Sequence, residues 1–145
     1  MSPQLRRYVR FFEELDLQSL QQVEHLFAPR ALFQDPFNRV RGPAAIRRIF
    51  SDLLAQFPHT RFQVSEALGE SALAYLRWQF QPRPDRPLCI DGVSRVVFDD
   101  AGLVLEHIDY WDSSSQLFAR LPVIGPPTRL LLRRFTAHGA DQVAM

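Results

Sequence analysis

The stretch "ALFQDPFNRVRG", residues 31–42, sets a carboxylate directly between an apolar run and a proline. Its first residues suit a short buried strand, Asp35-Pro36 suits the start of a loop, and the final Gly42 precedes a helix start. An acid this close to an apolar core costs free energy unless it has a hydrogen-bonding partner or a chemical task. The stretch therefore predicts a strand, a loop and a helix in that order, and it makes Asp35 the first candidate functional residue.

The composition indicates one globular domain and excludes several classes of protein. The chain has 145 residues, of which 46% are hydrophobic, which is enough to bury a real core. The formal charge of +1 gives no field that would favour nucleic acid as a partner. Cys89 is the only cysteine, so neither an intrachain disulfide nor a cysteine zinc site can form. No apolar run approaches a signal peptide or a membrane span, and we expect a cytoplasmic protein of bacterial type.

Helical periodicity dominates the N-terminal part of the chain. Ser2-Pro3 can cap and open a first helix, a second short helix is predicted to end at Pro29, and the clearest helix begins at Gly42-Pro43. The apolar residues at helical spacing are Leu5, Tyr8, Val9, Phe12 and Leu15, then Leu20, Val23, Leu26 and Phe27, then Ile46, Ile49, Phe50, Leu53, Leu54 and Phe57. Each set forms one stripe on its helix, so each helix is expected to pack on a shared core.

From Thr60 onward the apolar period changes to two, which is typical of strands. The predicted strands cover residues 62–68, 72–81, 88–98 and 103–111. The string "DDAG" at 99–102 is a hairpin signal between the last two. Helices followed by long antiparallel strands predict an α+β fold, in which three helices cover one face of a curved antiparallel sheet.

Three segments together resemble one known superfamily. Phe27-Ala28 leading to Asp35-Pro36-Phe37, Arg41-Gly42 at a helix start, and the string "EHIDYW" at 106–111 are similar to the nuclear transport factor 2-like fold. The nearest subgroups are the SnoaL-like polyketide cyclases, ketosteroid isomerase and limonene epoxide hydrolase, and the similarity covers roughly residues 5–120. It implies a cone-shaped fold, in which a strongly bent antiparallel sheet and three helices enclose a deep apolar pocket. It also implies a homodimer formed through the outer sheet face.

The resemblance to ketosteroid isomerase implies that Asp35 is a general base, because it lies in the same Gln-Asp-Pro-Phe string. In that enzyme a Tyr and a protonated Asp hold the oxyanion. Phe11 and Ser94 stand at those two positions here, so the base is kept and most of the oxyanion hole is not.

The resemblance to limonene epoxide hydrolase implies a different set of residues. Its catalytic carboxylate corresponds to Asp109, its bridging arginine to Arg77 and its second carboxylate to Gln79. Its water-positioning Tyr and Asn correspond to Phe33 and Asp35. SnoaL-like cyclases also use a carboxylate on the last strand as a base, and Asp109 matches that position as well.

Strand parity leaves two faces open for the strand 72–81, because side chains two apart share a face of a sheet. The family register sends one set into the pocket, namely Tyr75, Arg77 and Gln79. Hydrophobicity alone sends the alternate set inward, namely Leu76, Trp78 and Phe80. We expect the family register, because an apolar outer face would suit a dimer formed through the sheet.

We therefore expect Asp35 and Asp109 to handle protons in the pocket, with Arg77 as their catalytic partner between them. The residues expected to contact the ligand are Phe11, Phe33, Phe37, Tyr75, Gln79, Ser94, His107 and Trp111. A different interpretation remains open for each polar residue. Asp35 could be a loop acid that accepts backbone hydrogen bonds, Asp109 a surface carboxylate, and His107 a satisfied interior histidine.

The expected function is acid–base chemistry on a small hydrophobic molecule, by isomerisation, cyclisation or addition of water. The sequence contains no Gly-rich phosphate loop, and His107 with Asp109 finds no third metal ligand, so we expect no cofactor and no metal. The alternatives are a module that binds a ligand without catalysis and a domain for dimerisation or interaction with a partner.

The C-terminal part is expected to form a helical extension at 122–145, after a domain at 1–121. Ser113 to Ser115 can cap a last helix through Leu117, Phe118 and Leu121. The segment "TRLLLRRF" at 128–135 could form a basic amphipathic helix, which can meet a membrane surface. A short helix packed on its own domain or on a second copy is the expectation, so membrane contact is not predicted.

Overall fold

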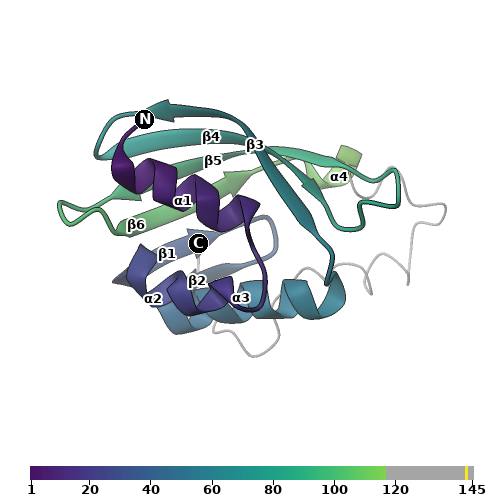
Figure 1. Ribbon diagram of the computed structural model, residues 1–145, viewed down its shortest axis with the longest axis horizontal. Coiled ribbons are helices and arrows are strands. Elements are labelled where there is room, and N and C mark those ends of the chain that lie inside the picture. The colour runs from purple at the N-terminus through teal and green to yellow at the C-terminus, as the bar shows by residue number, and fades with distance from the viewer. Residues whose placement is uncertain (117–142, 144–145) are drawn as a thin grey trace.

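A computed structural model of the protein describes residues 1–116 and Val143 (Figure 1). The helices are α1 (Pro3–Glu13), the 3-10 helix η1 (Ser19–Gln22), α2 (Val23–Leu26), α3 (Pro43–Gln56) and α4 (Ser113–Gln116). The strands are β1 (Phe27–Gln34), β2 (Arg39–Arg41), β3 (Arg61–Gly69), β4 (Leu73–Gln81), β5 (Ile90–Phe98) and β6 (Val104–Tyr110). The predicted helix through Leu121 is described only as far as Gln116, and the extension 122–145 lies outside the described residues apart from Val143. None of the helices in the described part of the chain is both long and apolar enough to cross a bilayer.

The strands form one sheet in the order β2-β1-β6-β5-β4-β3, with α1, α2 and α3 on one side of it (Figure 1). The α+β prediction with three N-terminal helices is confirmed. The prediction of a wholly antiparallel sheet is wrong, because β1 runs parallel to β6 and pairs Phe33 with His107. This pairing joins the first strand of the chain to the last. It places the loop after β1, which carries Asp35, beside the end of β6, which carries Asp109.

The first helix begins as its sequence predicts. The Ser2 side chain accepts a hydrogen bond from the Leu5 backbone N–H at 3.3 Å, and Pro3 occupies the first helical position. The buried side of α1 presents Leu5, Tyr8, Phe11 and Phe12 to the core. The rings of Phe12 and Phe50 meet edge to face with centroids 5.6 Å apart, which joins α1 to α3.

The second predicted helix is shorter than expected. Phe27 was predicted as its last apolar residue, but it is the first residue of β1, and α2 ends at Leu26. Pro29 lies within the strand, at an irregularity of the β1–β6 register between Phe27 and Leu32. A proline cannot donate to a sheet ladder, so it is tolerated where the pairing is interrupted.

The loop after β2 turns the chain into α3. Gly42 has a φ angle of +89°, a backbone conformation that residues other than glycine rarely adopt. Its N–H donates to the Ala31 carbonyl at 2.8 Å, which ties the start of α3 to β1. The sharp turn sends the apolar stripe of α3, with Ile46, Ile49 and Phe50, against the inner side of the sheet.

Strand β4 faces the other way from the family register. The buried side chains are those of Leu76, Trp78 and Phe80. The exposed ones alternate with them and are Tyr75, Arg77 and Gln79. Leu76, Trp78 and Phe80 carry more apolar surface than the alternate set, and burial of that surface stabilises the fold. This stabilisation is larger than any that the same side chains could gain on the outer face. Arg77 instead pairs with Glu66 of β3 at 3.3 Å on the outer face.

A pair of alanine variants on β4 tests this orientation. We expect Leu76→Ala to lower the free energy of unfolding by about 3 kcal/mol, because it removes buried methyl groups and leaves a cavity. Arg77→Ala should change it by less than about 0.5 kcal/mol, because only an exposed ion pair is lost. Urea unfolding followed by circular dichroism measures both, and a larger loss for Arg77→Ala would contradict the observed face.

Candidate functional site

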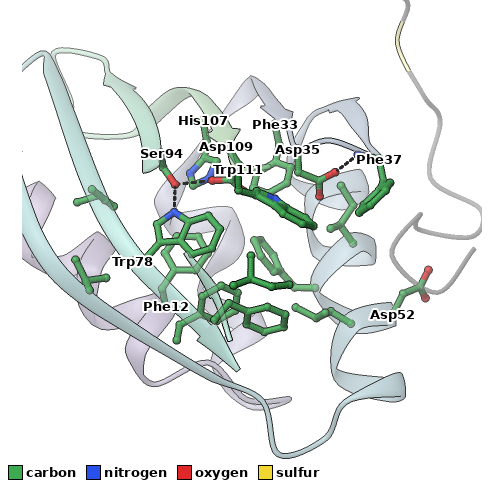
Figure 2. A pocket seen from close by; sticks show the side chains of 18 residues that line it. Phe12, Phe33, Asp35, Phe37, Asp52, Trp78, Ser94, His107, Asp109 and Trp111 are labelled. Carbon is green, nitrogen blue, oxygen red and sulfur yellow. Dashed lines mark hydrogen bonds and ion pairs between the residues drawn. The ribbon is translucent and has the colours of Figure 1, made fainter. Parts of the chain in front are cut away.

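An apolar cavity opens between the inner face of the sheet and helices α1 and α3 (Figure 2). Its empty volume is about 870 Å³, which includes the open mouth. Its lining residues are Phe12, Phe33, Asp35, Phe37, Ile49, Phe50, Asp52, Leu53, Phe62, Val64, Leu76, Trp78, Phe80, Ile90, Ser94, His107, Asp109 and Trp111. The wall is thus mostly aromatic and aliphatic. Asp35, Ser94, His107 and Asp109 lie on the β1–β6–β5 side, and Asp52 lies on α3, apart from them (Figure 2).

Seven of the eleven predicted site residues lie in this cavity. They are Asp35, Asp109, Phe33, Phe37, Ser94, His107 and Trp111. The two acids therefore converge on one cavity from distant points of the sequence, as expected.

The other four predicted site residues do not line the cavity. Phe11 is fully buried in the core behind it, one position from the lining residue Phe12. Tyr75, Arg77 and Gln79 lie on the outer face of the sheet, because β4 presents its apolar set inward. The prediction of an arginine between the two acids is therefore wrong, and none of the described residues that line the cavity is Arg or Lys.

Asp109 accepts two hydrogen bonds on the same oxygen. His107 Nε2 lies 2.6 Å and Ser94 Oγ lies 2.5 Å from its Oδ1. The side chain of Asp109 is 15% exposed, so these two contacts replace most of the water that the carboxylate loses. Within the described residues, Oδ2 of Asp109 has no hydrogen-bond partner.

The direction of both hydrogen bonds follows from the outer partners of Ser94 and His107, of which Figure 2 shows Trp78. Trp78 Nε1 lies 2.7 Å from Ser94 Oγ, and an indole N–H can only donate, so Ser94 directs its own proton to Asp109. On the other side, Tyr8 Oη lies 2.7 Å from His107 Nδ1. With a neutral imidazole that donates from Nε2 to Asp109, Nδ1 accepts from the Tyr8 hydroxyl.

The Tyr8 hydroxyl keeps its proton, and so remains a hydrogen-bond donor, at neutral pH and well above it. Burial, and then the negative charge of Asp109, raise the pKa of Tyr8 well above its ordinary value of 10.0. The two chains Tyr8–His107 and Trp78–Ser94 therefore both end on the Asp109 carboxylate. They orient it as the acceptor at the end of a buried polar network.

Asp35 has a different environment. Its Oδ1 accepts the backbone N–H groups of Phe37 and Asn38, each at 2.7 Å, and the Asn38 side-chain amide at 3.2 Å. Its Oδ2 accepts only the same Asn38 amide, at 3.1 Å. Asp35 therefore accepts backbone hydrogen bonds within its own loop, and it also lines the cavity.

The surroundings of Asp35 change its protonation. Burial raises the pKa of Asp35 from its ordinary value of 3.8 to about 7. The side-chain hydrogen bond from Asn38 opposes the rise, and the negative charge of Asp109 adds to it. About half of the Asp35 side chains are therefore protonated at neutral pH, and they can donate a proton or a hydrogen bond into the cavity.

Aromatic rings hold the polar side of the cavity in place. The Phe33 ring stacks on the His107 imidazole with centroids 4.7 Å apart and an angle of 16°. Phe37 meets Trp111 edge to face at 5.7 Å across the loop that follows β1. Rings in van der Waals contact restrict the rotamers of their neighbours, so these contacts fix the direction of the histidine and of the loop.

Sequence reasoning missed several residues of the site. Trp78 was given to the outer face, although its alternation with Leu76 and Phe80 was a sufficient signal. Tyr8 was found as an apolar helix position, but nothing in its sequence context indicates a hydroxyl partner 99 residues away. Phe12 of α1 and the α3 stripe were predicted as core, and part of that core is the cavity wall.

An α+β fold whose sheet and helices enclose an apolar cavity with a few convergent acids is typical of the nuclear transport factor 2-like superfamily. Within it, residues 5–107 match the SnoaL-like domain, and the chain belongs to this family. A search of the curated proteins finds no match.

Solved structures with the same fold support this assignment. A protein from Jannaschia sp., assigned to the SnoaL-like polyketide cyclases, is 16% identical with a TM-score of 0.70, covering 86% of this chain and 98% of its own. An Agrobacterium tumefaciens protein, assigned as an isomerase of the SnoaL-like family, is 19% identical with a TM-score of 0.65 (75% and 94% covered). A protein of unknown function from Mesorhizobium loti is 23% identical with a TM-score of 0.62 (75% and 88% covered). At these identities the likeness shows the fold.

The pH dependence of stability tests the state of Asp35. The folded protein holds the Asp35 proton up to about pH 7, whereas the unfolded chain loses it near 3.8. Between these values the folded state binds more protons, so this group lowers stability as the pH rises. We expect Asp35→Asn, which keeps an acceptor oxygen for the loop, to stabilise the fold increasingly from about pH 4 to about pH 8, by at most about 4 kcal/mol.

Denaturant unfolding at several pH values measures this difference. Asp85→Asn is the matched control, because Asp85 lies exposed in the loop between β4 and β5 and its replacement should change stability little at any pH. A stabilisation by Asp35→Asn that shrinks as the pH rises would contradict the raised pKa.

Proposed function

We propose that the protein catalyses acid–base chemistry without a cofactor on a small, mostly apolar carbonyl compound, as an isomerase or a cyclase. The observation that carries this proposal is the pair of acids in one apolar cavity with opposite environments. Asp109 is held as an acceptor by two donors, whereas Asp35 is half-buried near that acid and keeps its proton to about pH 7. Two titratable groups whose surroundings separate their protonation in this way are suited to the roles of base and acid.

Asp109 is the general base in this proposal. Its Oδ1 is occupied by His107 and Ser94, which leaves Oδ2 to remove a proton from the carbon next to a substrate carbonyl. The electron pair of the broken C–H bond forms a carbon–carbon double bond, and the π pair of the carbonyl moves to its oxygen, which gives an enolate.

Asp35 is the general acid. Its proton is best placed on Oδ2, because Oδ1 already accepts three hydrogen bonds. The protonated carboxyl donates to the enolate oxygen as its charge develops. Return of the proton from Asp109 to a different carbon gives an isomer. Attack of the enolate carbon on a second carbonyl closes a ring, and the alkoxide that forms takes the proton from Asp109.

These roles reverse the one implied by ketosteroid isomerase, in which Asp35 would be the base. The structure also disfavours the addition of water. The resemblance to limonene epoxide hydrolase implied Arg77 as the bridging arginine and Gln79 at the position of the second carboxylate. Both residues lie on the outer face of the sheet.

Exchange of hydrogen for deuterium in 2-tetralone tests the proposal. This ketone is small and mostly apolar, and its hydrogens next to the carbonyl can be followed by proton NMR in D₂O. We expect the native protein to accelerate exchange. Asp109→Asn should lower the catalysed rate at least about 100-fold and Asp35→Asn about 10-fold. Because Asp35 must be protonated, the native rate above background should fall above about pH 7, and Asp35→Asn should lose this fall.

Arg77→Ala and Gln79→Ala are the matched controls, since both residues lie outside the cavity and should leave exchange unchanged. Exchange that survives Asp109→Asn would contradict the assigned base. Binding of 2-tetralone, seen in tryptophan fluorescence, without any accelerated exchange would select a binding module instead.

We also propose that the protein forms a homodimer through the outer face of the sheet. Exposed apolar side chains gather there on neighbouring strands: Leu68 of β3, Leu73 and Tyr75 of β4, Val93 of β5, and Leu105 and Tyr110 of β6. An apolar surface shared by four strands is more than scattered surface residues require.

Sedimentation velocity of charged variants tests the dimer. Tyr75→Glu places a carboxylate in the middle of this surface and should shift the chain from dimer to monomer. Leu17→Glu is the control, because Leu17 is 70% exposed before η1 and away from the sheet face. A native protein that sediments as a monomer at all concentrations would contradict the dimer.

A further inference from the structure

The buried indole of Trp78 touches the polar network at the end farthest from the histidine. It belongs to β4, and its N–H donates across to Ser94 of β5 at 2.7 Å (Figure 2). Trp78 is 7% exposed and Ser94 is 1% exposed, so water does not compete for this contact. The next contact in the same line is Ser94 Oγ to Asp109 Oδ1 at 2.5 Å.

From this geometry we infer that Trp78 is a positioning residue for Asp109 and that Gly92 is the residue that makes its position possible. The inference rests on the proposed role of Asp109 as the base. The indole acts through Ser94 and sets the direction of the hydrogen bond that the carboxylate receives.

The direction matters because a serine hydroxyl can either donate or accept. With the Trp78 N–H on its oxygen, Ser94 satisfies its own proton only by donating to Asp109. A proton on Oδ1 of Asp109 would leave the Ser94 hydroxyl as a buried donor without an acceptor, which is costly. The contact therefore reserves Oδ1 as an acceptor and directs proton uptake to Oδ2.

Gly92 provides the room for the indole. It pairs directly with Trp78 in the β4–β5 register. A Cβ atom at position 92 would lie 2.3 Å from both Cη2 and Cζ2 of the indole and 2.9 Å from Cε2, closer than atoms can approach. The six-membered ring of the indole thus occupies the space that a side chain at position 92 would need, and only glycine permits this approach.

The indole signals in a ¹⁵N–¹H NMR spectrum of the full chain test the contact without any enzyme assay. The chain has two tryptophans, so this region holds two signals, and Trp111→Phe assigns them. We expect the Trp78 indole N–H to exchange slowly with water and to shift and exchange at least about 10-fold faster in Ser94→Ala. The Trp111 signal serves as the internal comparison and should keep its exchange rate. An unchanged Trp78 exchange rate in Ser94→Ala would overturn the contact.

Exchange of 2-tetralone tests the positioning role. Trp78→Phe keeps an aromatic ring and removes the N–H, and we expect kcat to fall about 10-fold with KM changed less than about twofold, because a misdirected base slows the chemical step. A merely structural role would predict equal kcat for the folded variant, and that result would overturn the inference. If the native protein shows no exchange, the proposed function fails, while the NMR experiment still decides whether Trp78 holds Ser94.

Alanine at position 92 tests the space requirement. Gly92→Ala should destabilise the fold and abolish the slow exchange of the Trp78 indole. In the Trp78→Phe background the same change should cost much less, because the smaller ring lacks the atoms that the Cβ would meet. Equal destabilisation in both backgrounds would show that Gly92 is needed for a reason other than the indole.

Discussion

The carboxylate of Asp109 is the group on which the arrangement of the site depends. An ionised acid in an apolar cavity is stable only when donors replace the water that it has lost. Here the donors come from two directions, with His107 on the same strand and Ser94 on the neighbouring strand. Each of these donors accepts a hydrogen bond in turn, His107 from the Tyr8 hydroxyl and Ser94 from the Trp78 indole N–H. The polar network therefore joins α1, β4, β5 and β6 around one oxygen atom.

The same charge explains the contrast between the two acids. Asp109 has two strong donors and lies where the sheet can supply them, whereas Asp35 lies in a loop and relies on Asn38 and backbone N–H groups. Hydrogen bonds alone would favour ionised Asp35, but burial near a second negative charge outweighs them and raises its pKa to about 7. None of the described residues that line the cavity is an arginine that could neutralise the charge of the two carboxylates. A proton on Asp35 reduces that charge instead. Asp109 is thus held as an acceptor by two donors, whereas burial first, and then the charge of Asp109, hold a proton on Asp35 up to about pH 7.

The sequence predicted the α+β class and the convergence of these acids because both follow from local patterns. Asp35 stands at the end of an apolar strand before Pro36, and Asp109 shares its strand face with His107 and Trp111, so period-two alternation was sufficient for both. Strand β4 was placed wrongly because a register carried over from distant relatives was preferred to the hydrophobicity of Leu76 and Trp78. A one-residue difference in register moves every side chain of a strand to the other face. The parallel pairing of β1 with β6 was missed for another reason, since strand order and direction across a sheet are set by contacts between segments far apart in the chain.

The orientation of β4 also explains why the arginine that the resemblance to limonene epoxide hydrolase implied is absent from this cavity. A strand can place either an arginine or an indole at the inner position beside β5, and each choice supports a different chemistry. An arginine would bridge two carboxylates, keep both ionised and suit the activation of water. The indole of Trp78 is neutral and donates one hydrogen bond, so it orients Asp109 through Ser94 and adds no positive charge near Asp35. Without that positive charge Asp35 can hold a proton at neutral pH. In the proposed mechanism, the choice of Trp78 over Arg77 as the inward residue is therefore what separates the roles of the two carboxylates.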